Sequence, residues 1–458
     1  MDKDALISEL FIRLEKLEKR ILELEVYEKE NIILRERLSR YENPKNSRNS
    51  SVPPSKDENR PRKNQSLRRS TGKKPGGQSG HTGRTLEMTS TPDYVIDLYP
   101  DICNNCGLSL DDLEPTKEKS RQIVDIPPIK AQWKEYRIYS KKCSCGCQST
   151  SSFPEGVNSP VSYGEHIEGL IGYFHARQYL PFARMKEVFN DVFNIAISEG
   201  GIHYLLNRFA DKATPIYNII RERVAKSKVI GTDETGVKVN GNKHWFWTWQ
   251  TPHLTYIAHS DTRGKAAIDS HFSQGFPKAT LVRDGWRPQI ATIALHHQTC
   301  LPHLLRHLNY LNQKYKKAQW SRNFKTLLYD AIELDKNQEA KNKDVNRIKI
   351  VQRLENLLEK PPNKKHKELF AFYKRICRER QNLFTFLFIK EVPSHNNASE
   401  TAIRNVKVKQ KISGQFKKEK TAQKFAIIRS VIDTTIKNGM NVIEALALIA
   451  KLQPLKAN

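Results

Sequence analysis

Three carboxylates in this chain stand in settings that suit metal-dependent chemistry. Asp233 follows an apolar, β-branched run, and Asp284 ends a second run of the same kind. Glu400 falls in the first turn of a predicted helix. The candidate caps for that helix are Asn396, Asn397 and Ser399. A carboxylate on a buried strand is costly unless it is paired or binds a metal.

Carboxylate oxygens are the ligands that Mg²⁺ and Mn²⁺ prefer. Two such ions about 3.5–4 Å apart activate an attacking hydroxyl and stabilise the leaving oxygen in phosphoryl transfer. The alternative for any one of these acids is a simple cap at the end of a strand or helix. Three acids in suitable settings, on a chain with a formal net charge of +27, favour metal-dependent chemistry.

The sequence pattern also predicts the elements that position the acids. The first strand, residues 229–237, carries Asp233 and is followed by Asn240-Gly241, a strong hairpin signal. Two aromatic and β-branched runs then complete a three-strand meander. Asp284 ends a further strand after a short helix-compatible stretch.

A long helical region separates the second and third acids. Asp284 and Glu400 are 400 − 284 = 116 residues apart, and the sequence is helical from residue 301 to 388. We therefore expect an all-α insertion between the last strand and the helix of Glu400. At its start Cys300, His303 and His307 share a helical face, which leaves a second zinc site open as an alternative.

These motifs resemble the insertion sequence 66 family of bacterial transposases, which are DDE transposases with a ribonuclease-H-like core. The resemblance covers essentially the whole chain, and its most specific part is the Asn-Asn-Ala-Ser-Glu motif that ends on Glu400. The other matching motifs are Asp-Glu-Thr at 233–235, Asp-Gly-Trp-Arg-Pro at 284–288, Gln-Thr-Cys at 298–300, His-Leu-Leu-Arg at 303–306 and Lys-Ile-Ser-Gly at 411–414.

The resemblance implies that Asp233, Asp284 and Glu400 are the catalytic residues and hold two Mg²⁺ or Mn²⁺ ions. Water would then cleave a phosphodiester at the end of the element, and the freed 3′-hydroxyl would attack target DNA. The family places the motif around Cys300 beside the active site with no metal assigned to it. It also implies a leucine-zipper-like amino terminus.

Composition indicates the partner and the compartment. The excess of 77 Lys and Arg over 50 Asp and Glu favours nucleic acid as the partner, because basic side chains replace the counterions condensed on phosphates. A ribosomal-type or membrane-surface role is the alternative explanation of this charge. The sequence lacks an apolar run long enough for a membrane span and the core of a signal peptide. Seven cysteines, five of them grouped in one segment, indicate metal binding in a reducing compartment. We expect a bacterial cytoplasmic protein that associates with the nucleoid.

The first 42 residues have the pattern of a coiled coil. Apolar residues recur at alternating spacings of three and four, and the short step from Leu24 to Tyr27 is a stammer. Asn31 is a polar residue on the seam. We expect a homo-oligomer through this helix, the alternative being an amphipathic helix packed on its own domain.

A basic linker follows. Residues 44–85 contain eleven Lys or Arg and two acids, and they lack the apolar content that folding needs. The stretch is a solvated tether, a DNA-tracking arm, or both. Its candidate DNA-binding residues are Arg68, Arg69, Lys73 and Lys74.

The cysteine cluster predicts one structural zinc. Cys103 and Cys106 form one half of a zinc knuckle, and Cys143 and Cys145 form the other, with Cys147 as an alternative to Cys145. The competing interpretation is five free or buried thiols. Four thiolates would leave no ligand position for water, so the zinc would be structural.

Two further regions are a helical segment before the first acid and a basic segment after the third. Residues 160–225 predict short helices laid out either as a helix-turn-helix or as an ordinary bundle. After Glu400 the sequence is basic, and Arg404, Lys409 and Lys411 are candidates for holding DNA phosphates, unless they only solvate a helix face.

The predicted fold is an α/β ribonuclease-H-like catalytic core with an all-α insertion, preceded by a coiled-coil helix, a disordered basic linker, a small zinc-binding module and a helical segment. The expected boundaries are 1–42, 43–92, 93–155, 160–225, 226–437 with the insertion at about 301–390, and a helical tail at 438–458. The expected function is a DNA transposase that binds double-stranded element ends and target DNA, with or without accessory proteins. A catalytically inactive DNA-binding relic or regulator and a structure-specific nuclease of the same fold are the alternatives.

Overall fold

The computed structural model describes residues 3–42, 44, 46, 76, 78, 80–83, 85–154, 157, 159–337 and 343–453. Within them the chain divides into two units. The larger unit contains the described residues of 1–65, 137–187 and 197–458, and the smaller one those of 66–136 and 188–196. Most of the predicted basic linker lies outside the described residues.

A five-stranded mixed sheet forms the centre of the larger unit. Its strands are β3 (Val229–Val239), β4 (Asn242–Gln250), β5 (Thr255–Ser260), β6 (Phe276–Arg283) and β7 (Ala294–Thr299), in the order β5-β4-β3-β6-β7. β3, β4 and β5 pair antiparallel, whereas β3, β6 and β7 are parallel. The predicted meander is therefore confirmed, and the sheet continues on its other side with parallel strands.

The hairpin and the connecting segments follow local chemistry. Asn240 and Gly241 have φ values of 47° and 79°, as the tight turn between β3 and β4 requires. The helix-compatible stretch gives only α5 (Lys265–Asp269), and α6 (Arg287–Ile290) begins just after Asp284. β7 was not predicted, so the expectation that Asp284 ends the last strand is wrong. The strand is half exposed along its first residues, which hides its apolar pattern.

Helices that precede and follow the strands in the sequence pack around the sheet. α12 (Asn397–Ser413) contacts β3 and β4, and α13 (Glu419–Lys437) contacts β5. α13 also packs with α2 (Glu165–Ala176), α4 (Glu199–Ala225) and α14 (Val442–Ala450). These contacts make α2 and α4 part of the packing on the sheet, which favours the bundle over a separate helix-turn-helix.

A buried ion cluster fixes this bundle. Glu168 on α2 is almost fully buried, and its carboxylate accepts from Arg208 at 3.0 Å and from Lys212 at 2.9 Å, both on α4. Lys212 also donates to the carbonyl of Ala450 at the end of α14. Removing one member would leave a buried charge without its partner, so these residues couple the early helices to the C-terminal ones.

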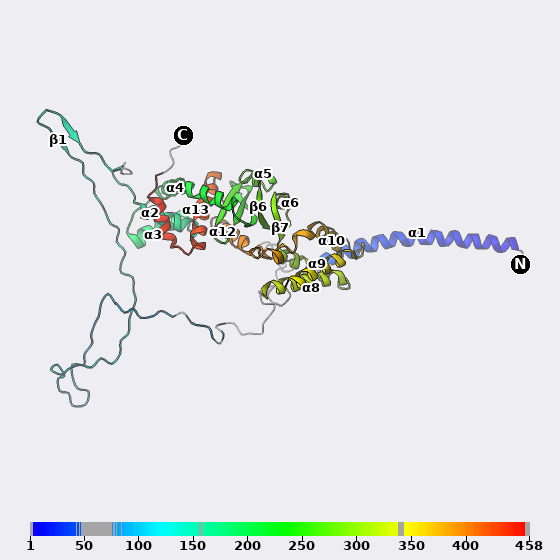
Figure 1. Cartoon of the computed structure of the whole chain (residues 1–458), viewed down its shortest axis with the longest axis horizontal. Coiled ribbons are helices and arrows are strands. Elements are labelled where there is room, and N and C mark those ends of the chain that lie inside the picture. Colours follow the sequence, from blue (N-terminus) through cyan, green and yellow to red (C-terminus); the bar gives the residue numbers. More distant parts are fainter. Residues whose placement is uncertain are drawn as a thin grey trace. The chain divides into compact units, whose positions relative to one another are not determined.

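The predicted all-α insertion is present, drawn mainly in yellow in Figure 1. It contains α7 (Leu301–Lys314), α8 (Gln319–Lys336), α9 (Lys343–Leu358), α10 (Lys367–Glu379), a 3₁₀ turn (Arg380–Asn382) and α11 (Thr385–Phe388). Phe324, Leu328 and Phe372 lie in its own apolar core. The Gln298 side chain on β7 donates to Leu383 O at 3.0 Å and accepts from Phe386 N at 3.0 Å, which fixes the insertion to the sheet.

The first helix, α1 (Lys3–Glu42), is 40 residues long. The apolar residues of the predicted seam are largely exposed in the single chain, among them Leu17 at 60% and Leu34 at 58%. Among the described residues no helix combines the length and the apolar character that a bilayer span needs.

The remaining elements are two short strands and one helix. β1 (Ser140–Lys142) and β2 (Gln148–Thr150) form an antiparallel pair around the second cysteine group. α3 (Phe182–Phe193) lies between α2 and α4 in the sequence.

Candidate active site

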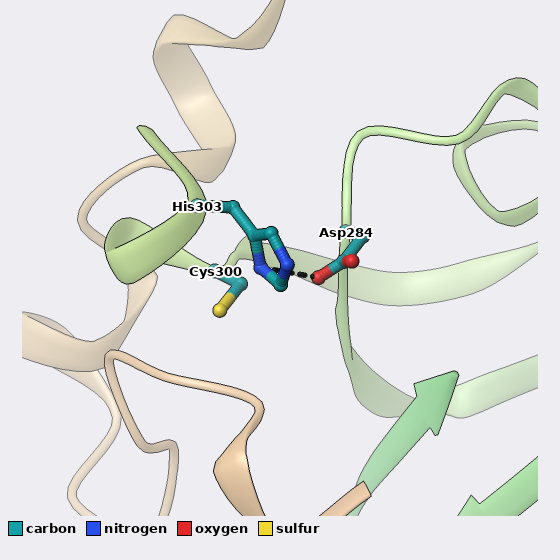
Figure 2. A group of neighbouring side chains, drawn as sticks. All are labelled: Asp284, Cys300 and His303. Atoms are coloured by element: carbon teal, nitrogen blue, oxygen red, sulfur yellow. Dashed lines mark ion pairs between the residues drawn. The ribbon is translucent and has the colours of Figure 1, made fainter. Parts of the chain in front are cut away.

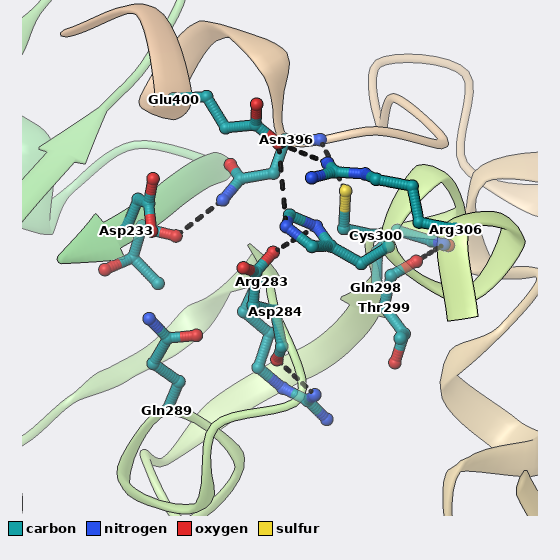
Figure 3. Close-up of polar contacts among 12 residues, drawn as sticks. Asp233, Arg283, Asp284, Gln289, Gln298, Thr299, Cys300, Arg306, Asn396 and Glu400 are labelled. Carbon is teal, nitrogen blue, oxygen red and sulfur yellow. Dashed lines mark hydrogen bonds and ion pairs between the residues drawn. The ribbon is translucent and has the colours of Figure 1, made fainter. Parts of the chain in front are cut away.

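The three predicted acids come together from three elements (Figure 3). Asp233 lies on β3, Asp284 directly follows β6, and Glu400 lies in the first turn of α12. β3 and β6 are adjacent parallel strands, so Asp233 and Asp284 meet near the same edge of the sheet. The carboxylates are only partly accessible: the side chains of Asp284 and Glu400 are 25% and 19% exposed.

The start of α12 is anchored to β3. Asn396 stands at the N-cap position but does not cap the helix with its side chain. Its amide instead donates to the carbonyl of Thr232 at 2.6 Å, one residue before Asp233. Gly231 permits this close approach, because a Cβ there would lie 2.6 Å from Ser399 Oγ. The Asn-Asn-Ala-Ser-Glu sequence at 396–400 therefore sets the position of Glu400 relative to Asp233.

Two basic residues that were not among the predicted catalytic residues, His303 and Arg306, lie among the acids. His303 Nδ1 is 2.8 Å from Asp284 Oδ1, and its Nε2 is 3.8 Å from Glu400 Oε1. Arg306, one turn further along α7, reaches the same Glu400 oxygen at 3.1 Å. The motif spacing offered a signal, because residues three apart on a helix share a face.

Two residues of this group, an acid and a histidine, have raised pKa values. Burial, and then the neighbouring charges of Asp284 and Glu234, raise the pKa of Asp233 well above its usual range. Burial lowers the pKa of His303, but Asp284 and Cys300 outweigh it and raise this pKa to about 10. Protonated His303 therefore neutralises part of the acid cluster.

The residues fit divalent cations. Asp284 Oδ1 is buried and makes no well-aligned hydrogen bond within the described chain, apart from its ion-pair contact with His303. Close carboxylates that resist ionisation are what a cation would relieve. Asp233, Asp284 and Glu400 are the residues that would hold Mg²⁺ or Mn²⁺.

A smaller group combines one of these acids with sulfur and nitrogen. Within the described residues, the ligand atoms of Asp284, Cys300 and His303 lie within 4.8 Å of one another (Figure 2). The alternative zinc site predicted from the sequence had included His307. The structure instead packs the His307 ring against Phe372 at 4.9 Å, so that ligand set is not assembled.

A fourth acid, Glu234, supports the site from the next position on β3. Its Oε1 accepts from Arg263 at 2.7 Å and its Oε2 from Gln289 at 2.6 Å. This ties the loop before α5 and the helix after Asp284 to β3. Glu234 was not among the predicted site residues, although it is the direct neighbour of Asp233.

The predicted phosphate-binding residues have different positions. Arg404 and Lys411 are exposed on α12, and Arg404 also lies 3.4 Å from Glu400. Lys409 contradicts the prediction, because it is only 4% exposed and its ammonium lies 3.4 Å from His175. Helical periodicity turns it toward α2 rather than solvent. The remaining candidates, Arg68, Arg69, Lys73 and Lys74, lie outside the described residues.

The buried position of Lys409 predicts a pH-dependent stability. Burial lowers its pKa to about 8, against about 10.4 in an unfolded chain. The unfolded state therefore binds more protons between these values, and stability rises as the pH rises through that window. Lys409→Met should raise the free energy of unfolding at pH 7 by about 1–2 kcal/mol, measured by urea denaturation, and should remove the rise. Lys411→Met, an exposed control, should leave stability unchanged; a destabilised Lys409→Met protein would contradict the assignment.

The cysteines form two similar turns, each described within its own unit. In the first, Gly107 N donates to Cys103 O at 2.9 Å and Cys103 N to Leu108 O at 2.8 Å. In the second, Gly146 N donates to Cys143 O at 2.9 Å and Cys143 N to Cys147 O at 2.8 Å. Gly107 and Gly146 both have positive φ, 73° and 89°. Between the two cysteine groups, residues 122–126 and 133–139 are not in strands.

The backbone of each turn faces the first thiol. Amide hydrogen bonds from Cys106 and Asn105 lower the pKa of Cys103, and those from Cys145 lower the pKa of Cys143. A lowered pKa favours the thiolate, which is the form that binds a metal.

Comparison with protein families identifies the chain. Residues 161–424, more than half of its length, match the model described as the transposase IS66 family. The chain belongs to the IS66 family of transposases. Residues 100–146 match the zinc-finger binding domain of transposase IS66, so a structural zinc is supported. A comparison with curated proteins returns no significant match.

The matched ranges agree with the packing of this family member. The transposase match begins before α2 and ends within α13, so it includes the early helices together with the sheet. The zinc-finger match ends at Gly146 and includes four of the five grouped cysteines.

Proposed function

We propose that this family member is a DNA transposase that binds the ends of a bacterial insertion sequence, cleaves them and joins them to target DNA. The observation that carries the proposal is the convergence of Asp233, Asp284 and Glu400 on one partly buried site. The sheet order, with an antiparallel meander continued by parallel strands, supports a ribonuclease-H-like core.

The chain's own residues would prepare the site for two divalent cations. Once bound, those cations would activate the attacking hydroxyl and stabilise the leaving oxygen. The three acids would hold them, while Asn396 keeps Glu400 close to β3. His303 and Arg306 neutralise the acids before the metals bind and are then available to the anionic DNA.

For zinc we propose the ligands Cys103, Cys106, Cys143 and Cys145. The two turns support Cys145 over Cys147, because in each turn one cysteine directly precedes the positive-φ glycine. Cys147 instead takes the place of Leu108, whose carbonyl closes the first turn. The domain match also ends before Cys147.

For DNA we propose contacts from Arg404 and Lys411 beside the acids and from the basic arm that includes Arg68, Arg69, Lys73 and Lys74. Lys409 does not belong to these contacts, because its side chain is buried. Phosphate contacts of this kind give sequence-independent, salt-dependent affinity. The likeness to bacterial transposases supports action on nucleoid DNA in the cytoplasm, with or without accessory proteins.

The exposed seam of α1 supports self-association through a coiled coil. Deleting the residues before Asn43 should lower the molar mass measured by light scattering, because the exposed apolar seam would be absent. Replacing only Glu18 and Glu25, both exposed on α1, with Gln would preserve the seam and should leave the mass unchanged. An unchanged mass after deletion would assign oligomerisation to another surface.

A strand-transfer assay with labelled terminal repeats tests the proposed function. We expect Mg²⁺-dependent cleavage followed by products in which the labelled 3′ end is joined to target DNA. Cleavage without joined product would favour the structure-specific nuclease. Binding without either reaction would favour the DNA-binding relic or regulator.

A further inference from the structure

A series of cations and indoles lies at the surface beside the second acid, and we call it the cation–indole ladder. Its members are Lys243, Trp245, Arg263 and Trp286. Lys243 Nζ and the Arg263 guanidinium each lie 4.8 Å from the centre of the Trp245 ring. The same guanidinium lies 3.8 Å from the centre of the Trp286 ring. Arg263 therefore links the two indoles.

The ladder is held in place from beneath. Arg263 donates to Glu234 Oε1 through Nε at 3.0 Å and through Nη2 at 2.7 Å. Trp286 Nε1 donates to Arg263 O at 3.4 Å. Gly236 lies opposite Trp245 in the sheet, with the indole packed close to its backbone. A surface ordered in this way loses little conformational entropy when a ligand binds.

The end of the ladder is open to solvent. Trp286 is 36% exposed although Arg263 covers part of its ring, and the Arg263 side chain is 39% exposed. Cations and open aromatic faces are the combination that binds single-stranded nucleic acid, where phosphates meet the charges and bases stack on the rings. A paired base inside a duplex has its faces covered by its neighbours, so the ligand that fits is an unpaired nucleotide.

We propose that Trp286 and the cation–indole ladder bind an unpaired nucleotide next to the cleaved phosphodiester. This inference rests on the proposed function, and it adds the form of the DNA at the site. Trp286 is two residues from Asp284, so their Cα atoms are at most about 7 Å apart. That is about two nucleotides along one strand of B-form DNA. Stacking there would hold the strand open beside the acids.

The test compares two DNA probes on the full-length, zinc-loaded protein without Mg²⁺, so that nothing is cleaved. One probe is a blunt duplex, and the other has the same duplex with a thymidine flap and 2-aminopurine at the junction. We expect Trp286→Ala to lower the affinity for the flapped probe about tenfold or more and the affinity for the blunt probe less than about twofold. Wild type should quench the 2-aminopurine fluorescence and Trp286→Ala should not, while Trp286→Phe should restore most of the affinity.

Tyr204 provides a matched control, because it is 63% exposed on α4 and carries Arg208 at 5.8 Å from its ring. Tyr204→Ala should bind both probes as wild type does. Equal losses on the two probes, or unchanged quenching in Trp286→Ala, would overturn the proposal. Cleavage is measured separately, in the strand-transfer assay with Mg²⁺. If wild type cleaved no DNA there yet bound the flapped probe better than the blunt one in a Trp286-dependent way, the catalytic proposal would fail and the nucleotide site would stand.

Discussion

Asp233→Asn is expected to lower the rate of DNA cleavage by at least about a thousandfold while leaving DNA affinity nearly unchanged. The substitution keeps the shape of the side chain and removes the charge that a divalent cation needs. Arg404 and Lys411, which are exposed, are untouched by it. Single-turnover cleavage of labelled ends in Mg²⁺ measures the first effect, and fluorescence anisotropy measures the second.

The same variant has a readout independent of activity. The fold raises the pKa of Asp233, so ionising its carboxylate destabilises the metal-free protein. The free energy of unfolding therefore falls as the pH rises through this pKa. Asp233→Asn should therefore be more stable than wild type at neutral pH without metal, and Mg²⁺ should stabilise wild type more strongly. Asp269→Asn, at an exposed position on α5, is the control. Comparable cleavage by Asp233→Asn would remove Asp233 from the metal site.

Cys106→Ser is expected to abolish binding of the structural zinc, from about one ion per chain in wild type. Metal binding and folding are coupled in so small a module, so residues 100–146 should become sensitive to protease. Recognition of the DNA end should fall with it, whereas nonspecific nicking in Mn²⁺ should survive, because the acids lie elsewhere in the chain. Elemental analysis and limited proteolysis measure these effects.

Cys147→Ser is the informative control for the zinc ligands. In the second turn Cys147 contributes its carbonyl oxygen, which serine retains, so this variant should keep its zinc. Loss of zinc in Cys147→Ser with retention in Cys145→Ser would reverse the assignment. A Cys106→Ser protein without zinc that still recognised DNA ends normally would overturn the division between DNA positioning and chemistry.

Local pattern predicted the elements that carry the acids. Apolar, β-branched and aromatic runs, an Asn-Gly turn and helix-start residues are local signals, so the meander, the strand of Asp233 and the helix of Glu400 could be predicted from the sequence. β7 could not, because an edge strand with exposed residues lacks a clear apolar period.

The positions of the other site residues depend on tertiary contacts. Charge alone made Lys409 a surface candidate, but the packing of α2 against the C-terminal helices buries it. His303 and Arg306 belonged to a recognised motif, yet only the packing of α7 beside Asp284 and Glu400 gives them a partner. Contacts between residues distant in sequence carry no local signal, which is why these roles required the structure.

The hydrogen bond from Asn396 to Thr232 has a consequence for the timing of biosynthesis. It joins residues 396 − 232 = 164 positions apart, so the site depends on a long-range contact that forms slowly. At about 5–20 residues per second, synthesis from Asp233 to Glu400 takes roughly 8–33 s. During that interval the zinc module and the basic arm have already been translated, but the third acid has not. If the proposed function holds, a nascent chain acquires the segments proposed to bind DNA before it acquires the complete set of acids proposed to cut it.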